Sequence, residues 1–216
     1  MNKKNGTKRD DTTLLALVVD RSGSMETIRT DMEGGIRTLL AEQAAEPGTC
    51  LVSLAQFDTD YELVFEAAPI EAVIGYQLVP RGGTALLDAI GRTIGGVREA
   101  IDHMTPEGRP EHVIFAVVTD GMENSSREWS RDKVMSAVKE RSDAGWHFSF
   151  LGANQDAIKE GGDMGVAAAA SLTYDASGAG VAGAMSSFSA SVRRVRSRAD
   201  ASLTYTEAER RAAEKR

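Results

Sequence analysis

Three short segments of the sequence carry side-chain oxygens in a pattern that could hold a metal ion. Residues 20–24 read Asp-Arg-Ser-Gly-Ser, residues 82–84 read Gly-Gly-Thr, and residues 119–121 read Thr-Asp-Gly. Five of their side chains, two acids and three hydroxyls, form a donor set without an imidazole or a thiolate, which favours Mg²⁺, with Mn²⁺ as the alternative, over Zn²⁺. The predicted metal ligands are Asp20, Ser22, Ser24, Thr84 and Asp120.

Both acids follow long apolar runs, which tells us what must position them. Residues 12–19 and 112–119 are continuously apolar or nearly so, as expected of strands that are buried on both faces of a parallel sheet. In open α/β sheets, ligands bind beyond the carboxyl ends of the strands where the strand order reverses. If these two strands are neighbours, the three segments converge at one edge of the sheet.

Ordinary structural roles are available for some of these residues taken singly. Ser24 and Thr84 could be helix N-caps, and Asp120 could be a turn residue before a glycine. Capping does not explain why acids end two buried strands, because a carboxylate there is costly unless a cation or hydrogen-bond donors offset its charge. The metal hypothesis accounts for the whole set.

The remaining pattern alternates strands with helices. Residues 50–57 and 61–67 are β-rich and separated by a tight polar turn, which predicts an antiparallel hairpin at one sheet edge. Alternation of this kind indicates β-α-β units and a mostly parallel sheet with helices on both faces. Helical spacing of apolar residues predicts helices from about residue 28 to 46 and over 85–104, 131–144 and 180–196, and further strands are predicted at 146–151 and near Leu172.

The pattern Asp20-x-Ser22-x-Ser24, followed by Thr84 after a glycine pair and Asp120 in Thr-Asp-Gly, resembles the metal-ion-dependent adhesion site of von Willebrand factor A domains. All five positions are filled, and the resemblance covers roughly residues 12–196. It implies a Rossmann-like three-layer α/β/α sandwich with a mostly parallel six-stranded sheet and one antiparallel edge strand. It also implies direct metal contacts from Ser22, Ser24 and often Thr84, and contacts from the two acids that can run through water.

The resemblance further implies a non-enzymatic module that binds a protein partner, whose Glu or Asp carboxylate completes the coordination of the metal. A compact member of this kind looks like bacterial or phage intracellular proteins. We therefore expect a flexible extension over residues 1–11, the A domain over 12–196, and a polar, charged tail over 197–216.

Composition narrows the setting and the partners. The net charge of −7 disfavours nonspecific nucleic-acid binding, although residues 193–216 hold eight Lys or Arg against four Asp or Glu. No apolar run is long enough for a membrane span, and the first residues do not resemble a signal peptide. Cys50 has no partner for an internal disulfide. We expect a cytoplasmic protein that binds neither nucleic acid nor membrane.

Two other functions are compatible with parts of the pattern. A magnesium-dependent phosphohydrolase of the haloacid-dehalogenase type also begins with an aspartate at the end of its first strand, but it needs a second acid two residues later, where this chain has Ser22. The sequence also lacks the Gly-x-x-x-x-Gly-Lys-Ser/Thr phosphate loop. An extracellular adhesion domain is the alternative within the binding class.

A few further residues near the predicted site attract interest. Asp58 and Asp60 belong to the hairpin turn at the same end of the sheet, where they form either a solvated turn or a rim that selects partners. Glu123 and Asn124 follow the second acid closely and are candidates for hydrogen bonds within the metal loop, although the family pattern gives them no firm role. Trp129 and Trp146 are predicted to pack rather than to bind a partner; of the two, Trp129, in a loop among polar residues, is the better candidate for an exposed anchor.

Overall fold

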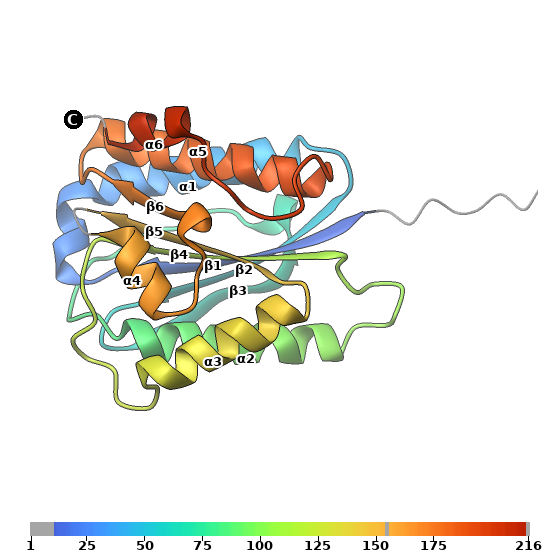
Figure 1. Ribbon diagram of the computed structural model, residues 1–216, viewed down its shortest axis with the longest axis horizontal. Helices are drawn as coiled ribbons and strands as arrows, with labels where there is room; N and C mark the ends of the chain where they lie inside the picture. The colour runs from blue at the N-terminus through green and yellow to red at the C-terminus, as the bar shows by residue number, and fades with distance from the viewer. Residues whose placement is uncertain (1–10, 154–155, 215–216) are drawn as a thin grey trace, which may run out of the picture.

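The computed structural model describes residues 11–153 and 156–214 and contains one six-stranded sheet (Figure 1). The strand order is β3-β2-β1-β4-β5-β6, and every neighbouring pair is parallel except β2 and β3. The predicted antiparallel edge strand is therefore confirmed. The strands are β1 (Thr12–Asp20), β2 (Thr49–Phe57), β3 (Tyr61–Pro69), β4 (His112–Thr119), β5 (His147–Ala153) and β6 (Ser171–Tyr174).

Helices cover both faces of the sheet and complete the predicted three-layer sandwich (Figure 1). One face carries α1 (Arg29–Ala44), α5 (Gly178–Arg196) and α6 (Glu207–Ala213), and the opposite face carries α2 (Leu86–Asp102) and α3 (Arg131–Asp143). The short helix α4 (Ala157–Asp163) packs against β5 and β6. Three 3₁₀ turns span Gly23–Ile28, Ile70–Ala72 and Ala168–Ala170.

The two central strands explain the continuous apolar runs. In β1 every residue from Leu14 to Val19 is at most 1% exposed, and β4 is buried from Val113 to Thr119. Fully burying one such aliphatic side chain contributes about 1.5–3 kcal/mol, so both faces of these strands select apolar residues. Val19 pairs with Val118 in parallel register, so β1 and β4 end side by side. The sheet thus places the acids that follow these strands at the same edge.

The C-terminal segment differs from the polar tail predicted for residues 197–216. In the part that the structure describes, this segment folds back onto α5 and ends in α6, and it buries Leu203, Tyr205 and Ala213. The Arg194 side chain forms ion pairs at 2.8 Å with Asp200 and at 2.7 Å with Glu209. Of the predicted N-terminal extension, residues 1–10 lie outside the described residues.

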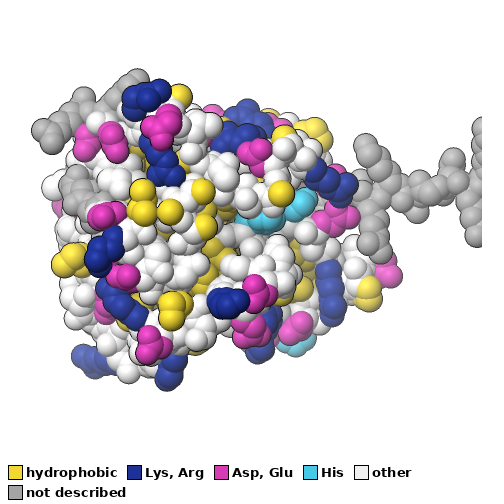
Figure 2. Space-filling model, viewed as in Figure 1, with side chains coloured by type: hydrophobic (Ala, Val, Ile, Leu, Met, Phe, Trp, Pro, Cys, Tyr) yellow, Lys and Arg dark blue, Asp and Glu magenta, His cyan; other side chains and the backbone are white. Residues whose placement is uncertain are grey.

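The surface view matches the mixed composition of the chain. Basic and acidic side chains are interspersed over the face shown in Figure 2, with short apolar patches between them. No helix within the described ranges combines the length and apolar character needed to cross a membrane.

Candidate metal centre

Asp20, the last residue of β1, has a fixed orientation below the surface. The residue is fully buried. Its Oδ1 accepts a hydrogen bond from the backbone N–H of Ser22 at 2.6 Å, and its Oδ2 accepts one from the Thr119 hydroxyl at 2.6 Å. Since Thr119 ends β4, the first acid is tied directly to the neighbouring strand. The sequence pattern singled out Asp20 and Ser22 but identified no role for Thr119.

Short contacts link the other residues of the first segment to the second acid. The Ser22 and Ser24 hydroxyl oxygens are 3.1 Å apart. The Ser24 Oγ in turn donates a hydrogen bond to Asp120 Oδ1 at 2.6 Å. Four of the five predicted ligands therefore form a continuous cluster, and the structure brings together side chains from the ends of β1 and β4.

Thr84 and Gly121 complete the arrangement. A methyl group at the Cβ position of Gly121 would lie 3.0 Å from Thr84 Oγ1, 3.6 Å from Asp20 Oδ2 and 3.7 Å from Ser22 Oγ. One point in space is therefore close to oxygens from the first two segments, and glycine leaves it clear of side-chain atoms. The donor set fits a small hard cation, because carboxylate and hydroxyl oxygens are the ligands such ions prefer.

The structure excludes the helix-capping alternative for the hydroxyls. The residues at the N-cap positions of the 3₁₀ turn, α1 and α2 are Ser22, Ile28 and Ala85, and none of them makes a side-chain capping bond. Ser24 lies inside the 3₁₀ turn and Thr84 precedes the N-cap of α2. Capping therefore does not account for these residue types.

Glu123 and Asn124, the candidates for hydrogen bonds within the metal loop, anchor the chain after Asp120 to Thr84 and to α2. The Glu123 carboxylate accepts the Leu87 N–H at 2.9 Å and so occupies the N-terminus of α2. Asn124 Oδ1 accepts the Thr84 N–H at 2.9 Å, and the Asn124 N–H donates to the Thr84 carbonyl at 3.0 Å. Thr84 is thus held through both of its backbone groups. These partners lie 36 to 40 residues apart in the sequence, so no local spacing could reveal them.

Asp88 holds the end of the loop that follows Asp120. Its carboxylate accepts the backbone N–H groups of Arg127, Glu128 and Trp129 at 2.8 to 3.0 Å. Burial opposes the charge, but the three donors outweigh burial and lower the pKa of Asp88. The loop after Asp120 is therefore attached to Thr84 and α2 from Glu123 to Trp129.

Asp58 is neither a solvated turn residue nor part of an exposed rim. It is 1% exposed, and its Oδ2 accepts hydrogen bonds from Arg21 Nε and Arg81 Nε, both at 2.8 Å. Burial opposes its ionisation, but the Asp60 N–H and the two guanidinium groups outweigh it, so the pKa of Asp58 is lowered. Asp60 itself is exposed in the turn, as a solvated turn residue would be.

Burial makes the two predicted acidic ligands unfavourable as carboxylates in the absence of a cation. Burial raises the pKa of Asp20 to about 6, against the hydrogen bonds from Thr119 and Ser22, and the negative charge of Asp120 adds to the rise. Burial also raises the pKa of Asp120. The described residues contain no group of three or more His, Cys, Asp or Glu that could hold a metal. A metal at this edge would thus depend on hydroxyl oxygens as well.

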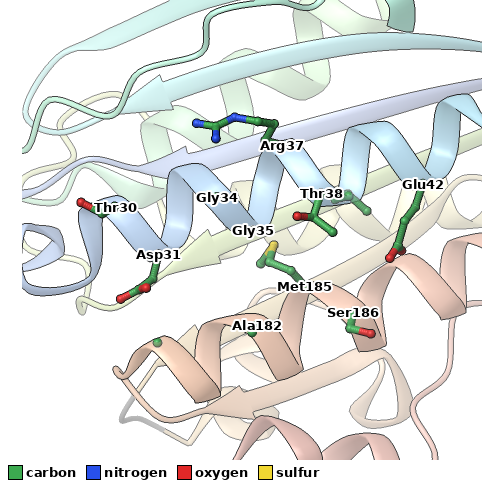
Figure 3. A pocket seen from close by; sticks show the side chains of 12 residues that line it. Thr30, Asp31, Gly34, Gly35, Arg37, Thr38, Glu42, Ala182, Met185 and Ser186 are labelled. Atoms are coloured by element: carbon green, nitrogen blue, oxygen red, sulfur yellow. The ribbon is translucent and has the colours of Figure 1, made fainter.

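The groove between α1 and α5 is a separate feature, about 370 Å³ in volume (Figure 3). Met185 points toward Gly35, whose Cβ position lies only 2.7 Å from Met185 Cγ, whereas Arg37 points away from α5. The glycine therefore permits a close approach of the two helices. None of the five predicted ligands lines this groove.

Trp129 packs against the helix layer, as predicted, and is not an exposed anchor. It is half-buried, and its indole lies against Gly91 of α2, where an added Cβ would come within 2.0 Å of the ring. It packs the loop that follows Asp120 onto α2.

Comparisons with protein-family models and with curated proteins give no match. Solved structures do match. Proximal thread matrix protein 1 from the mussel byssus, with a zinc-occupied MIDAS motif, has a TM-score of 0.59 at 14% identity over 87% of this chain and 46% of its own. A von Willebrand factor type A protein from Catenulispora acidiphila has a TM-score of 0.57 at 18% identity, covering 85% and 43%.

The pilus adhesin SpaC from Lactobacillus rhamnosus GG, in its open conformation, has a TM-score of 0.61 at 12% identity, covering 86% of this chain and 30% of its own. This chain thus spans less than half the length of each of these three proteins. The matches extend over most of this chain. The chain has the fold of von Willebrand factor type A proteins.

Proposed function

We propose that this chain is a non-enzymatic, metal-dependent protein-binding module. Asp20, Ser22, Ser24, Thr84 and Asp120 would hold one Mg²⁺, with Mn²⁺ as an alternative. The main support for this proposal is that side-chain oxygens from separate segments lie close to the point where a Cβ atom on residue 121 would be, which glycine leaves free. The zinc-occupied MIDAS motif named for the mussel byssus protein, which has a similar fold, supports metal binding by this chain.

The partner that this site fits best carries an exposed Glu or Asp. When bound, the ion would supply a Lewis-acidic centre for that carboxylate. The chain provides at most two negative charges, from Asp20 and Asp120, so a divalent ion is no more than neutralised. Glu123 already occupies the N-terminus of α2. That helix end therefore does not compete with the metal for the partner's carboxylate.

Gly121 allows the metal site to be blocked without removing a ligand. We expect Gly121→Ala to lower Mg²⁺ affinity at least tenfold by placing a methyl group among the oxygens. The matched control is Gly95→Ala, because an added Cβ on that helical glycine meets nothing within 4 Å. Calorimetry should give one site in the parent and in Gly95→Ala. Equal affinity in Gly121→Ala and the parent would show that the metal lies elsewhere.

The partner itself is best found by affinity capture with Mg²⁺ and with chelator. A partner of the proposed kind is released by chelator, returns with Mg²⁺, and is lost with Gly121→Ala. Replacing its acidic residue should have the same effect. If capture of the partner does not depend on Mg²⁺, the metal does not contact the partner and only joins the three segments. The proposed setting is the cytoplasm, which the single buried thiol of Cys50 favours.

The phosphohydrolase alternative predicts metal-dependent hydrolysis of phosphate esters, which a binding module does not carry out. The residue two positions after Asp20 is Ser22, which cannot serve as the general acid of that mechanism. We expect no hydrolysis of phosphate monoesters above background with Mg²⁺ or Mn²⁺. Turnover that disappears in Asp20→Asn would establish an enzyme instead.

A further inference from the structure

Asp58 connects two of the three segments that carry the proposed ligands. Through Oδ2 it accepts one hydrogen bond from Arg21, which lies between Asp20 and Ser22, and one from Arg81, three residues before Thr84. The Asp58 side chain is 2% exposed and the Arg21 side chain 5% exposed. A single buried carboxylate oxygen therefore joins the first segment to the second.

Backbone contacts at the same place reinforce this junction. The Asp58 carbonyl accepts the Ala85 N–H at 2.8 Å, directly after Thr84. The Arg81 N–H donates to the Arg21 carbonyl at 2.8 Å. The neighbouring Thr59 hydroxyl accepts the Gly83 N–H at 3.0 Å, directly before Thr84. The β2–β3 turn thus holds the chain on both sides of Thr84.

We propose that Asp58 is a positioning residue of the metal centre, which sets the placement of Thr84 relative to Ser22 and Ser24 by holding Arg21 and Arg81. This inference rests on the proposed function, because it assigns Asp58 a role toward the same five oxygens. Asp58 does not itself reach the site. It acts through the two arginines and through the backbone next to Thr84.

The charge of Asp58 is what the junction requires. Two guanidinium Nε–H groups converge on one oxygen, an arrangement that a carboxylate stabilises more strongly than a neutral amide. In Asp58→Asn the amide offers only one acceptor oxygen, and its NH₂ group faces donors. Arg21 keeps its ion pair with Glu62, so the first segment stays partly anchored while Arg81 and the second segment lose their charged partner.

The test is a double-mutant cycle on Mn²⁺ affinity, measured by calorimetry on the full chain. Asp58→Asn and Thr84→Ala are each expected to weaken Mn²⁺ binding about tenfold, the effect of one lost charge-assisted hydrogen bond or ligand. If Asp58 acts by placing Thr84, the double variant is no more than about twofold weaker than Thr84→Ala alone. A merely structural role would give independent, multiplied losses.

Glu209→Gln is the matched control for a general loss of stability. It removes the charge of an ion pair with Arg194 between α5 and α6, on residues that carry none of the proposed ligands. Its melting temperature is expected to fall while its Mn²⁺ affinity equals that of the parent. If Glu209→Gln weakened Mn²⁺ binding as much as Asp58→Asn, the effect of Asp58 would be general destabilisation and the proposal would be overturned.

Arg81→Ala keeps the test decisive if Asp58→Asn does not fold. The Arg81 side chain is 57% exposed, so its removal leaves no buried vacancy, yet it removes one arm of the junction. We expect a loss of about threefold in Mn²⁺ affinity, which again does not add to that of Thr84→Ala. Parent-like affinity in both Asp58→Asn and Arg81→Ala, or additive losses with Thr84→Ala, would refute the positioning role alone. A parent chain that binds neither Mn²⁺ nor Mg²⁺ would instead refute the proposed function, and the inference with it.

Discussion

The Ser24 hydroxyl donates a 2.6 Å hydrogen bond to Oδ1 of Asp120, a residue 96 positions further along the chain. The proton of this hydroxyl is thereby committed to the carboxylate, and the oxygen lone pairs remain for another electrophile. The bond also spans the switch point between β1 and β4. A hydroxyl oxygen and a carboxylate from distant parts of the chain are therefore held at the same place.

Asp20→Asn should separate stability from metal binding. Asp20 is fully buried and its charge is costly there, so replacing it with a neutral isostere should leave the melting temperature in chelator unchanged or raise it. Excess Mg²⁺ should raise the melting temperature of the parent, because a ligand that binds only the folded state stabilises it. The same Mg²⁺ should not shift Asp20→Asn. A full shift in the variant would remove Asp20 from the ligand set.

Asp88 should make stability depend on acid pH. Its pKa is lowered in the folded state, so its contribution is fully present above the unfolded pKa of about 3.9 and is lost as the pH falls through the folded value. Asp88→Asn should therefore cost about 1–3 kcal/mol at pH 7 and progressively less below about pH 4. Urea unfolding of both proteins at pH 7 and pH 3 measures the difference. A difference that grows toward pH 3 would mean that the folded protein does not favour the ionised form of Asp88.

Gly91 should be intolerant of even one methyl group. In Gly91→Ala the new Cβ would overlap the Trp129 ring, and such overpacking costs about 1–3 kcal/mol. Gly95→Ala on the same helix should be neutral or stabilising, because it adds helix propensity without a contact. Urea titration followed by tryptophan fluorescence compares the two. Equal stability of the two variants would mean that Trp129 can move away at little cost.

Cys50 should be inert in the native protein. It is 4% exposed, and burial raises the pKa of its thiol to about 11, so little thiolate forms at pH 8. Ellman's reagent should react slowly with the folded chain. In guanidinium chloride it should react at once with one thiol per chain. Rapid native labelling would show that β2 opens locally on the time scale of the assay.

The sequence predicted those features that depend on patterns within one strand or one helix. The apolar runs before Asp20 and Asp120 required strands covered on both faces, and parallel strands end at a common edge. From these two facts follows the sheet type. The meeting of the two acids also requires β1 and β4 to be neighbours, which the sequence left as a condition and the structure shows. The identity of the hairpin followed from its short polar turn.

The features that the sequence did not predict depend on contacts between distant segments. Asp58 lies in a segment with the composition of a solvated turn. Only the folded structure shows that it binds Arg21 and Arg81, which are 37 and 23 residues away in the sequence. The short helices α4 and α6 have few apolar residues, and their stability comes from packing on existing elements. The packing of Trp129 was predicted, but the sequence did not identify the glycine on α2 that makes room for its ring.

The fold-back of the C-terminal segment bears on how copies of this chain behave toward one another. Arg210 donates to the carbonyl oxygens of Ser171 and Ala168, and the Asp175 N–H donates to the Ala213 carbonyl, so both ends of the last strand β6 are engaged. A bare outermost strand is a template on which another polypeptide can pair and polymerise. The last helix engages this border of the sheet, and we expect a chain cut short before Leu203 to expose β6 and to self-associate more readily than the full chain.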